Sequence, residues 1–329
     1  MQVRSATEVV ASEESFVKAS FSRQIKQRAS AEGFEKVGIV SAAPLDGEAR
    51  HFTEWLARDY HADMRWMARE PEKRTNPQAI FPAARSVVVV ALNYYTPHEH
   101  QDNPTTGKVS RYAWGDDYHD VVSQKLYSLL SWIKEERQEA EGKVCVDIQP
   151  MMDKAWAVRA GLGWLGKHTN VITPEYGSWV FIGELLLNLE LEYELDQMED
   201  HCGNCTLCID ACPTEAITEP YVVDANRCIS YATIELRAGE LPKQVAENLS
   251  GWLYGCDICQ DVCPWNRFEQ ATREGRFYPR DGNINAELEG VLELQPETYA
   301  ERFRHSSMKR AKLSGLQRNA RTLLDVQQT

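Results

Sequence analysis

Eight of the nine cysteines of this chain lie between positions 202 and 263, in two sets that each end in Cys-Pro. The first set occupies the stretch HCGNCTLCIDACP at 201–213, with the spacing C-x2-C-x2-C-x3-C-P. The second set ends in C-x2-C-x3-C-P at 256–264, and its remaining cysteine stands apart at position 228. This is the spacing of bacterial-type ferredoxin motifs, in which cysteine thiolates hold iron–sulfur clusters.

In two-cluster modules of this kind, the fourth cysteine of one motif ligates the other cluster. We therefore expect two [4Fe–4S] sites, one held by Cys202, Cys205, Cys208 and Cys263, and the other by Cys212, Cys228, Cys256 and Cys259. A pair of structural zinc sites is the alternative, because zinc also takes four-cysteine sets built from CxxC pairs. Zinc sites do not account for the third cysteine at the same spacing or for the proline after both sets, so iron–sulfur clusters are favoured.

Composition restricts the class of protein. The chain has 329 residues, of which 43% are hydrophobic and 26% charged, and a formal net charge of −13. No apolar run approaches the roughly 18 residues that span a bilayer, and the N-terminus lacks the apolar region of a secretion signal. We expect a cytoplasmic protein, whose thiols stay reduced rather than forming disulfides. Global acidity disfavours non-specific nucleic-acid binding but leaves room for a local basic surface.

Helical and β patterns alternate over residues 16–190 and predict one α/β domain that positions whatever the cysteines serve. The run SVVVVALNY at 86–94 predicts a central strand buried on both faces. Cys145 lies in another apolar strand and is expected to be a core residue. The remaining predicted helices span 16–32, 47–60, 117–137 and 153–160, and the remaining strands 36–40, 143–148, 169–173 and 178–189.

The acidic run at 190–200 is predicted to be a solvated connector between this domain and the cysteine-rich part. We therefore expect a polar tail at 1–15, the α/β domain at 16–195, a ferredoxin-like module at 196–265 and a helical segment at 266–329. The stretch GLGWLGKH at 161–168 misses the phosphate-binding loop by one residue, because His168 replaces the magnesium-binding hydroxyl. A helix precedes it and a strand follows, which is the wrong order for a nucleotide site.

The long stretch DIQPMMDKAWAVRAGLGWLGKHTNVITPEYGSWVFIGELLL at 147–187 carries the most specific information. Together with RTNP at 74–77, SRYAWGDDYHD at 110–120, CISY at 228–231 and YGCDICQDVCPWN at 254–266, it resembles the epoxyqueuosine reductases over about residues 20–320. The resemblance implies an α/β (α+β) cobalamin-binding domain related to nitroreductases and reductive dehalogenases. A two-[4Fe–4S] module and C-terminal HEAT-like helices would follow it.

The same resemblance implies the activity and its cofactors. The chain is expected to reduce epoxyqueuosine at the wobble position of tRNA to queuosine, the last step of queuosine synthesis. Two [4Fe–4S] clusters would pass electrons from a low-potential donor to cobalamin, which supplies the difficult chemistry. We expect a monomer. A reductive dehalogenase is disfavoured by the missing twin-arginine signal, and a ferredoxin-type electron carrier by the large α/β domain.

By resemblance, Asp147 is the proton donor that lets the epoxide oxygen leave, and burial beside the corrin is expected to raise its pKa. A helix N-terminal or turn aspartate is the alternative. Asp117 is expected to be either a helix cap or a site residue, His119 is not expected to bind cobalt, and Lys154 stands where the family often has arginine. The cobalamin contacts implied by the resemblance are Arg74, Ser110, Asp147, Val171, Ile182, Ser230, Gly255, Cys256 and Asp257.

A basic stretch near the C-terminus is expected to hold tRNA. The stretch SSMKRAKLSGLQRNA at 306–320 resembles the start of the family's HEAT-like helices, although the sequence stops at Thr329, where many members continue. A solvated helix face is the alternative. The basic residues are Arg302, Arg304, Lys309, Arg310, Lys312, Arg318 and Arg321.

Overall fold

A four-stranded antiparallel sheet forms the centre of the computed structural model, which describes residues 6–194 and 196–327. Its order is β1 (Lys36–Ser41), β2 (Ser86–Asn93), β7 (Val180–Leu187) and β4 (Gly142–Cys145). Every residue of β2 is buried, which confirms the central strand predicted from its valine run. The predicted mixture of helices and strands is confirmed, with antiparallel pairing between all neighbours of this sheet.

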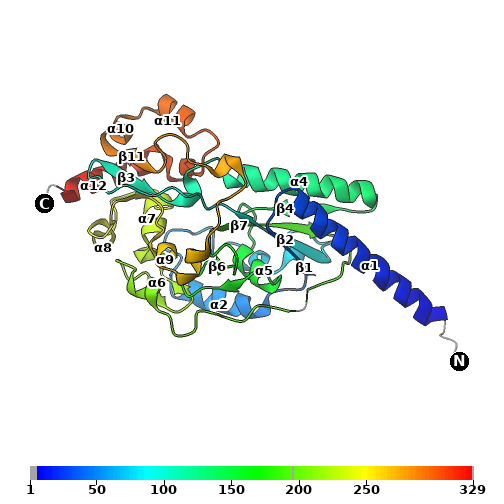
Figure 1. Cartoon of the computed structure of the whole chain (residues 1–329). Coiled ribbons are helices and arrows are strands. Elements are labelled where there is room, and N and C mark those ends of the chain that lie inside the picture. Colours follow the sequence, from blue (N-terminus) through cyan, green and yellow to red (C-terminus); the bar gives the residue numbers. More distant parts are fainter. Residues whose placement is uncertain (1–5, 195, 328–329) are drawn as a thin grey trace.

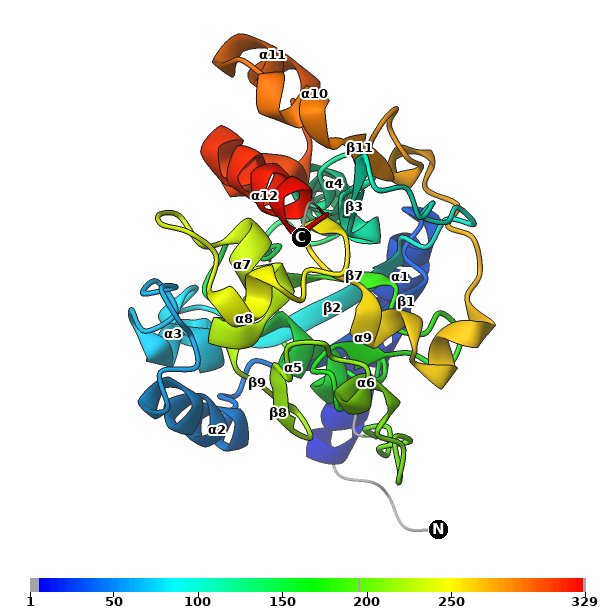
Figure 2. The ribbon, with the colours of Figure 1, turned by 90° about the vertical axis from the view of Figure 1, so that its left-hand side faces the viewer.

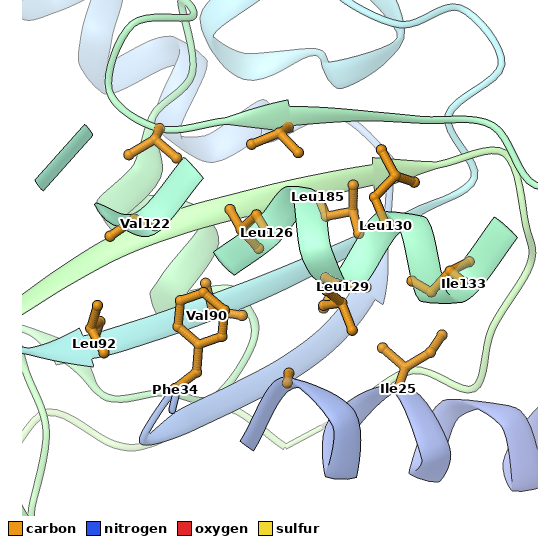
Figure 3. Close-up of a cluster of buried hydrophobic side chains, with 14 of the residues drawn as sticks. Ile25, Phe34, Val90, Leu92, Val122, Leu126, Leu129, Leu130, Ile133 and Leu185 are labelled. Carbon is orange, nitrogen blue, oxygen red and sulfur yellow. The ribbon is translucent and has the colours of Figure 1, made fainter. Parts of the chain in front are cut away.

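Alternate residues of β2 face two different cores, as the two-residue period of a strand requires. Val88 and Val90 pack with α1 (Ala6–Ala31) and α4 (Tyr118–Glu136) on one face, as Figure 3 shows. Val87 and Val89 pack on the other face against α5 (Asp153–Arg159). On that side the chain also forms α2 (Asp46–Ala57) and α3 (Pro71–Thr75) (Figure 1).

Helix α1 corrects one prediction. It begins at Ala6, so the polar tail expected at 1–15 is wrong for residues 6–15, whereas residues 1–5 lie outside the described part. The sequence ATEVVASEES is polar, yet it contains good helix formers and no glycine or proline, so it continues the helix predicted from residue 16.

A second sheet joins segments that are distant in the sequence. Its order is β10 (Trp252–Tyr254), β3 (Thr106–Val109) and β11 (Asn285–Glu287), with β3 parallel to β10 and antiparallel to β11. The three strands come from the predicted α/β domain, the cysteine module and the C-terminal segment. These regions therefore share one core, which includes Val109, Leu253 and Ala286.

Short helices surround this second sheet. They are α7 (Ile229–Ile234), α8 (Lys243–Ala246), α10 (Leu288–Glu293), α11 (Pro296–Arg302) and α12 (Lys312–Gln327). Helix α12 packs against α7, α8 and α10 (Figure 2). The helical character predicted for 266–329 is confirmed, with strand β11 as an addition.

The cysteine module repeats a small pattern. Helix α6 (Leu207–Asp210) lies within the first motif and α9 (Ile258–Asp261) within the second, and the two pack together. Near them lie two small hairpins, β5 (Trp164–Leu165) with β6 (Val171–Ile172), and β8 (Ile217–Glu219) with β9 (Val222–Val223). In the described part of the chain, no helix combines the length and apolar character needed to cross a membrane.

Candidate functional site

The first predicted cluster site is a pocket. Its volume is about 330 Å³, and four cysteines contribute to its lining: Cys202, Cys205, Cys208 and Cys263. This is the grouping that the crossover rule predicts, since the last cysteine belongs to the second motif. Burial raises the pKa of the Cys208 thiol to about 11, and the three neighbouring cysteines add to the effect. Four thiolates this close need a cationic group between them, so the donor set fits an iron–sulfur cluster.

The second set is also brought together, and it is more deeply buried. Burial raises the pKa of Cys256, and the nearby thiols of Cys259 and Cys228 raise it further. Cys228 in turn interacts with Cys212. These mutual effects indicate that the four remaining cysteines lie near one another, as the second predicted donor set requires.

Lys167 and His168, the residues of the near-miss phosphate loop, serve the first cysteine pocket instead. The Lys167 ammonium donates to the carbonyl oxygens of Gly203 (2.6 Å) and Cys205 (2.9 Å). His168 lines the same pocket, and burial lowers its pKa to about 4, so the imidazole is neutral. The stretch therefore orders the loop between the first two cysteines and provides no phosphate site.

Three predicted cobalamin contacts hold the second cysteine set in place. Ser110 donates a hydrogen bond of 2.5 Å to Asp257, and the backbone N–H of Arg111 donates one of 2.7 Å to the same carboxyl group. Gly255 has a φ of +69°, and a Cβ there would lie 2.4 Å from that of Ser110. Ser110 and Asp257 are buried, so these hydrogen bonds are shielded from solvent.

Asp147 follows strand β4 in a left-handed conformation, with a φ of +52°. Its carboxylate accepts a hydrogen bond from the Tyr118 hydroxyl and lies 3.7 Å from Nε2 of His119. The other ring nitrogen of His119, Nδ1, lies 2.7 Å from Oδ1 of Asp117. That same oxygen accepts from the His119 backbone N–H, so Asp117 both caps α4 and orients the imidazole.

The charged neighbours of Asp147 correct the expectation that its pKa is raised. Desolvation raises its pKa, but the hydrogen bonds from His119 and Tyr118 outweigh that effect and hold the pKa below its ordinary value. Desolvation lowers the pKa of His119, but Asp117 and Asp147 raise it to about 9. At neutral pH the proton therefore resides on His119 and Asp147 is ionised. Sequence reasoning only excluded His119 as a cobalt ligand and gave it no role, although its place in the motif DDYHD put it beside a capping carboxylate.

Lys154 connects Asp147 with the second cysteine set. Its side chain is exposed and donates to Oδ1 of Asn170 at 2.8 Å. Desolvation nevertheless lowers its pKa, against the raising effects of Asp147 and of Cys259 and Cys228. Lys154 therefore lies within reach of the charges of both Asp147 and the second cysteine set.

The remaining predicted contacts divide into two groups. Arg74 is buried, donates to the carbonyls of Trp66 (3.1 Å) and Met67 (3.2 Å), and interacts with the charge of Asp147. Ser230 is half-buried in α7, two residues after Cys228. Val171 and Ile182, in contrast, belong to the hydrophobic core on the α5 side of the sheet.

The basic residues near the C-terminus include one that is buried, one that is ion-paired and several that are exposed. Arg318 is buried and donates to the carbonyls of Ala232 (2.8 Å) and Leu236 (3.0 Å), so the expectation that it contacts tRNA is wrong. Arg310 forms a bidentate ion pair with Glu235, at 2.6 and 2.8 Å. The exposed side chains of Arg302, Arg304, Lys309, Lys312 and Arg321 remain as an available basic surface.

Comparison with protein families gives two matches. Residues 74–148 match the family model described as epoxyqueuosine reductase QueG, DUF1730. Residues 201–266 match the model of a 4Fe-4S double cluster binding domain, which covers the eight clustered cysteines.

Individual proteins agree with these matches. The epoxyqueuosine reductase of Synechocystis sp. is 48% identical over 88% of this chain and 99% of its own length. That of Gloeobacter violaceus is 46% identical over 92% of this chain and 95% of its own length. A solved epoxyqueuosine reductase with an epoxyqueuosine-modified tRNA-Tyr stem loop superposes with a TM-score of 0.87 at 31% identity, covering 93% of this chain and 81% of that one.

Proposed function

The chain belongs to the epoxyqueuosine reductase family, and we propose that it reduces epoxyqueuosine in tRNA to queuosine with electrons that pass through its two [4Fe–4S] clusters. The identity with curated members over nearly the whole chain carries this proposal. The placement of Asp147 and His119, linked through Lys154 to the second cysteine set, supports it. Overall, one epoxide takes up two electrons and two protons and becomes an alkene and water.

Cobalamin would bind where the exposed side chains of Asp147 and Lys154 lie within reach of the charges of the second cysteine set. The turn from Gly255 to Asp257, which Ser110 holds through Asp257, carries Cys256 of that set. Arg74, whose charge acts on that of Asp147, and Ser230, two residues after Cys228, would contact the group together with Asp147. When bound, cobalamin supplies a low-valent cobalt that is strongly nucleophilic toward an epoxide carbon.

His119, Asp117 and Asp147 determine where the proton of the site is held. His119 carries a proton at neutral pH, held between Asp117 and Asp147. Asp147 is exposed, accepts from Tyr118 and lies 3.7 Å from Nε2 of His119, so it can relay that proton to an oxygen bound in front of it. The acid in the resting site is thus His119, and Asp147 is the group that touches the substrate oxygen.

The basic surface is suited to the anticodon stem. Lys309 lies in the 3-10 helix Ser307–Ala311, and Lys312 and Arg321 lie in α12. We propose that these residues and the adjacent helices, of HEAT-like kind, contact phosphates while the modified base leaves the loop stack to reach Asp147. We also propose that the chain acts as a monomer in the cytoplasm, supplied by a low-potential electron donor, because eight unpaired cysteines require a reducing compartment.

One experiment tests the function. Protein reconstituted with iron, sulfide and cobalamin is incubated with a strong reductant and epoxyqueuosine-tRNA, and the digested RNA is searched for queuosine. Asp147→Asn should retain iron and cobalamin and lose turnover by about a hundredfold or more. The exposed Asp120→Asn, on the same helix as His119, serves as the matched control with wild-type turnover. Full activity of Asp147→Asn would defeat its assigned role, and no queuosine from the unchanged protein would defeat the function.

A further inference from the structure

Glu184 is a carboxylic acid in the middle of the central sheet. It lies in β7, directly opposite Val89 of β2 and Cys145 of β4, and is 0% exposed. Its side chain points to the α5 face, because Val89 and Cys145 belong to the core on that side. No donor group reaches either of its carboxyl oxygens. The group that it faces is another acid, Asp153, the first residue of α5, whose Oδ1 also lacks a donor.

Two buried carboxyl groups in contact cannot both be ionised, and a proton between them supplies the donor that both lack. Burial raises the pKa of Glu184 well above its ordinary range, and Asp153 raises it further. Burial also raises the pKa of Asp153, to about 7, with Asp147 adding to the effect. Glu184 therefore stays protonated and donates to Asp153, while Asp153 gains and loses its own proton near neutrality.

The surroundings do not neutralise this pair. Lys154 donates to Asn170, and Arg74 donates to the carbonyls of Trp66 and Met67. Cys145 is a buried neutral thiol. The titratable or charged groups that interact with the pair include Asp147, Lys154, Arg74, Cys145 and Tyr118.

The pair lies beside the proposed active site. Only the loop 148–152 separates Asp147 from Asp153, and the charge of Asp147 acts on both members of the pair. The reaction consumes two protons: one when the C–O bond of the epoxide breaks, and one when the oxygen leaves as water. His119 holds a single proton, so the other must come from solvent or from another group close to Asp147.

We propose, resting on the function above, that the carboxyl pair Asp153–Glu184 is a second proton-holding site of this active centre. Glu184 keeps its proton and orients Asp153, and Asp153 gives up the second proton toward Asp147. The electrons come from the low-potential donor through the clusters, so each turnover balances as epoxide plus two electrons plus two protons giving alkene plus water. Asp153 and Glu184 act through Asp147 and do not touch the substrate.

Two variants test the pair. Asp153→Asn can still accept the hydrogen bond of Glu184 but has no transferable proton, so turnover at pH 7 should fall about tenfold. The unchanged protein should lose activity as pH rises through about 7 because Asp153 loses its proton there, and Asp153→Asn should lack this step in its pH profile. Glu184→Gln keeps a neutral donor toward Asp153, so the step in the pH profile that Asp153→Asn abolishes should persist in this variant.

The control variant is Glu35→Gln. Burial also raises the pKa of Glu35, which precedes β1, but its carboxylate accepts from the Asn93 backbone and does not face Asp147. Wild-type turnover and an unaltered pH profile in Asp153→Asn would overturn the proposal.

A second measurement needs no substrate. Infrared difference spectra of the protein between about pH 6 and about pH 8 should show a protonated-carboxyl band that titrates and that Asp153→Asn removes. Glu184→Gln should remove a carboxyl band that does not titrate over this range. The absence of both bands overturns the proposal even in an active enzyme. If instead the unchanged protein makes no queuosine, the proposed function fails while the infrared result still decides whether the pair holds protons.

Discussion

Asp117 has two functions that follow from one oxygen atom. Oδ1 caps the N-terminus of α4 and also contacts Nδ1 of His119 at 2.7 Å. Asparagine caps a helix as well as aspartate does, so Asp117→Asn removes the charge and retains the cap. The substitution therefore separates the electrostatic function of Asp117 from its structural one.

We predict that Asp117→Asn lowers the pKa of His119 from about 9 toward its ordinary value of 6.5. The raised pKa means that the ion pairs of His119 stabilise the fold fully below pH 6.5, and that this contribution is lost as pH rises through about 9. Turnover of the unchanged protein should decline as pH rises through about 9. Turnover of Asp117→Asn should decline at a lower pH. Titration of the His119 ring protons by NMR measures both values. An unchanged His119 pKa in the variant contradicts the prediction.

The turn before Cys256 depends on a residue without a side chain. Gly255 has a φ of +69°, and an added Cβ would lie 2.4 Å from the Cβ of Ser110, whose hydroxyl holds Asp257. We predict that Gly255→Ala displaces this turn and loses the second cluster, so iron content falls to about half. Gly239→Ala is the matched control, because Gly239 also has a positive φ, +79°, with open space around it. Iron content after reconstitution is measured for both variants. A full iron content in Gly255→Ala would show that the turn tolerates a side chain.

Sequence patterns predicted the long elements and several short ones, such as α5 and β1, but missed the short strands of the second sheet. Strand β2 was predictable because an unbroken run of valines suits a strand buried on both faces. Strands β3 and β10 are only a few residues long and pair across more than a hundred positions, so neither composition nor period marks them. The early start of α1 was missed because its polar residues were read as a tail although they favour a helix.

The candidate site was predictable only where a motif carried it. The cysteine grouping follows from spacing, because each motif fixes its own geometry. Neither the ionised state of Asp147 nor the Asp153–Glu184 pair follows from any pattern, since both depend on which side chains the fold places together. Arg318 is a second example of a contact that no pattern predicts. It lies in a basic stretch of the sequence, yet its side chain donates to backbone carbonyls inside the protein.

The interlocked cysteine sets make the two motifs interdependent across the molecule. With the crossed grouping, Cys208 and Cys263 serve one cluster, and Cys212 serves the other. We predict that Cys208→Ser with Cys263→Ser loses one cluster, whereas Cys208→Ser with Cys212→Ser loses both. Grouping by position in the sequence would reverse the two results. Iron and sulfide content of the two double variants distinguishes the groupings.

The charge of the whole molecule makes the basic C-terminal surface decisive for RNA. With a net charge of −13, most of the protein repels phosphate, so binding must rest on local cations. The exposed Lys309 and Lys312 carry such charge near the end of the chain. We predict that Lys309→Glu with Lys312→Glu weakens binding of the anticodon stem-loop about tenfold or more and lowers its salt dependence by about one unit of slope per lost phosphate contact.

Titrations of a labelled stem-loop at several salt concentrations measure both quantities. Lys134→Glu with Arg50→Glu, two exposed reversals in α4 and α2, serves as the control because it makes the same change in charge at a different place. An equal loss in that control would show that net charge alone governs binding. An affinity of the unchanged protein that does not vary with salt would show that the lysines make no phosphate contacts, since releasing counterions from RNA always leaves a salt dependence.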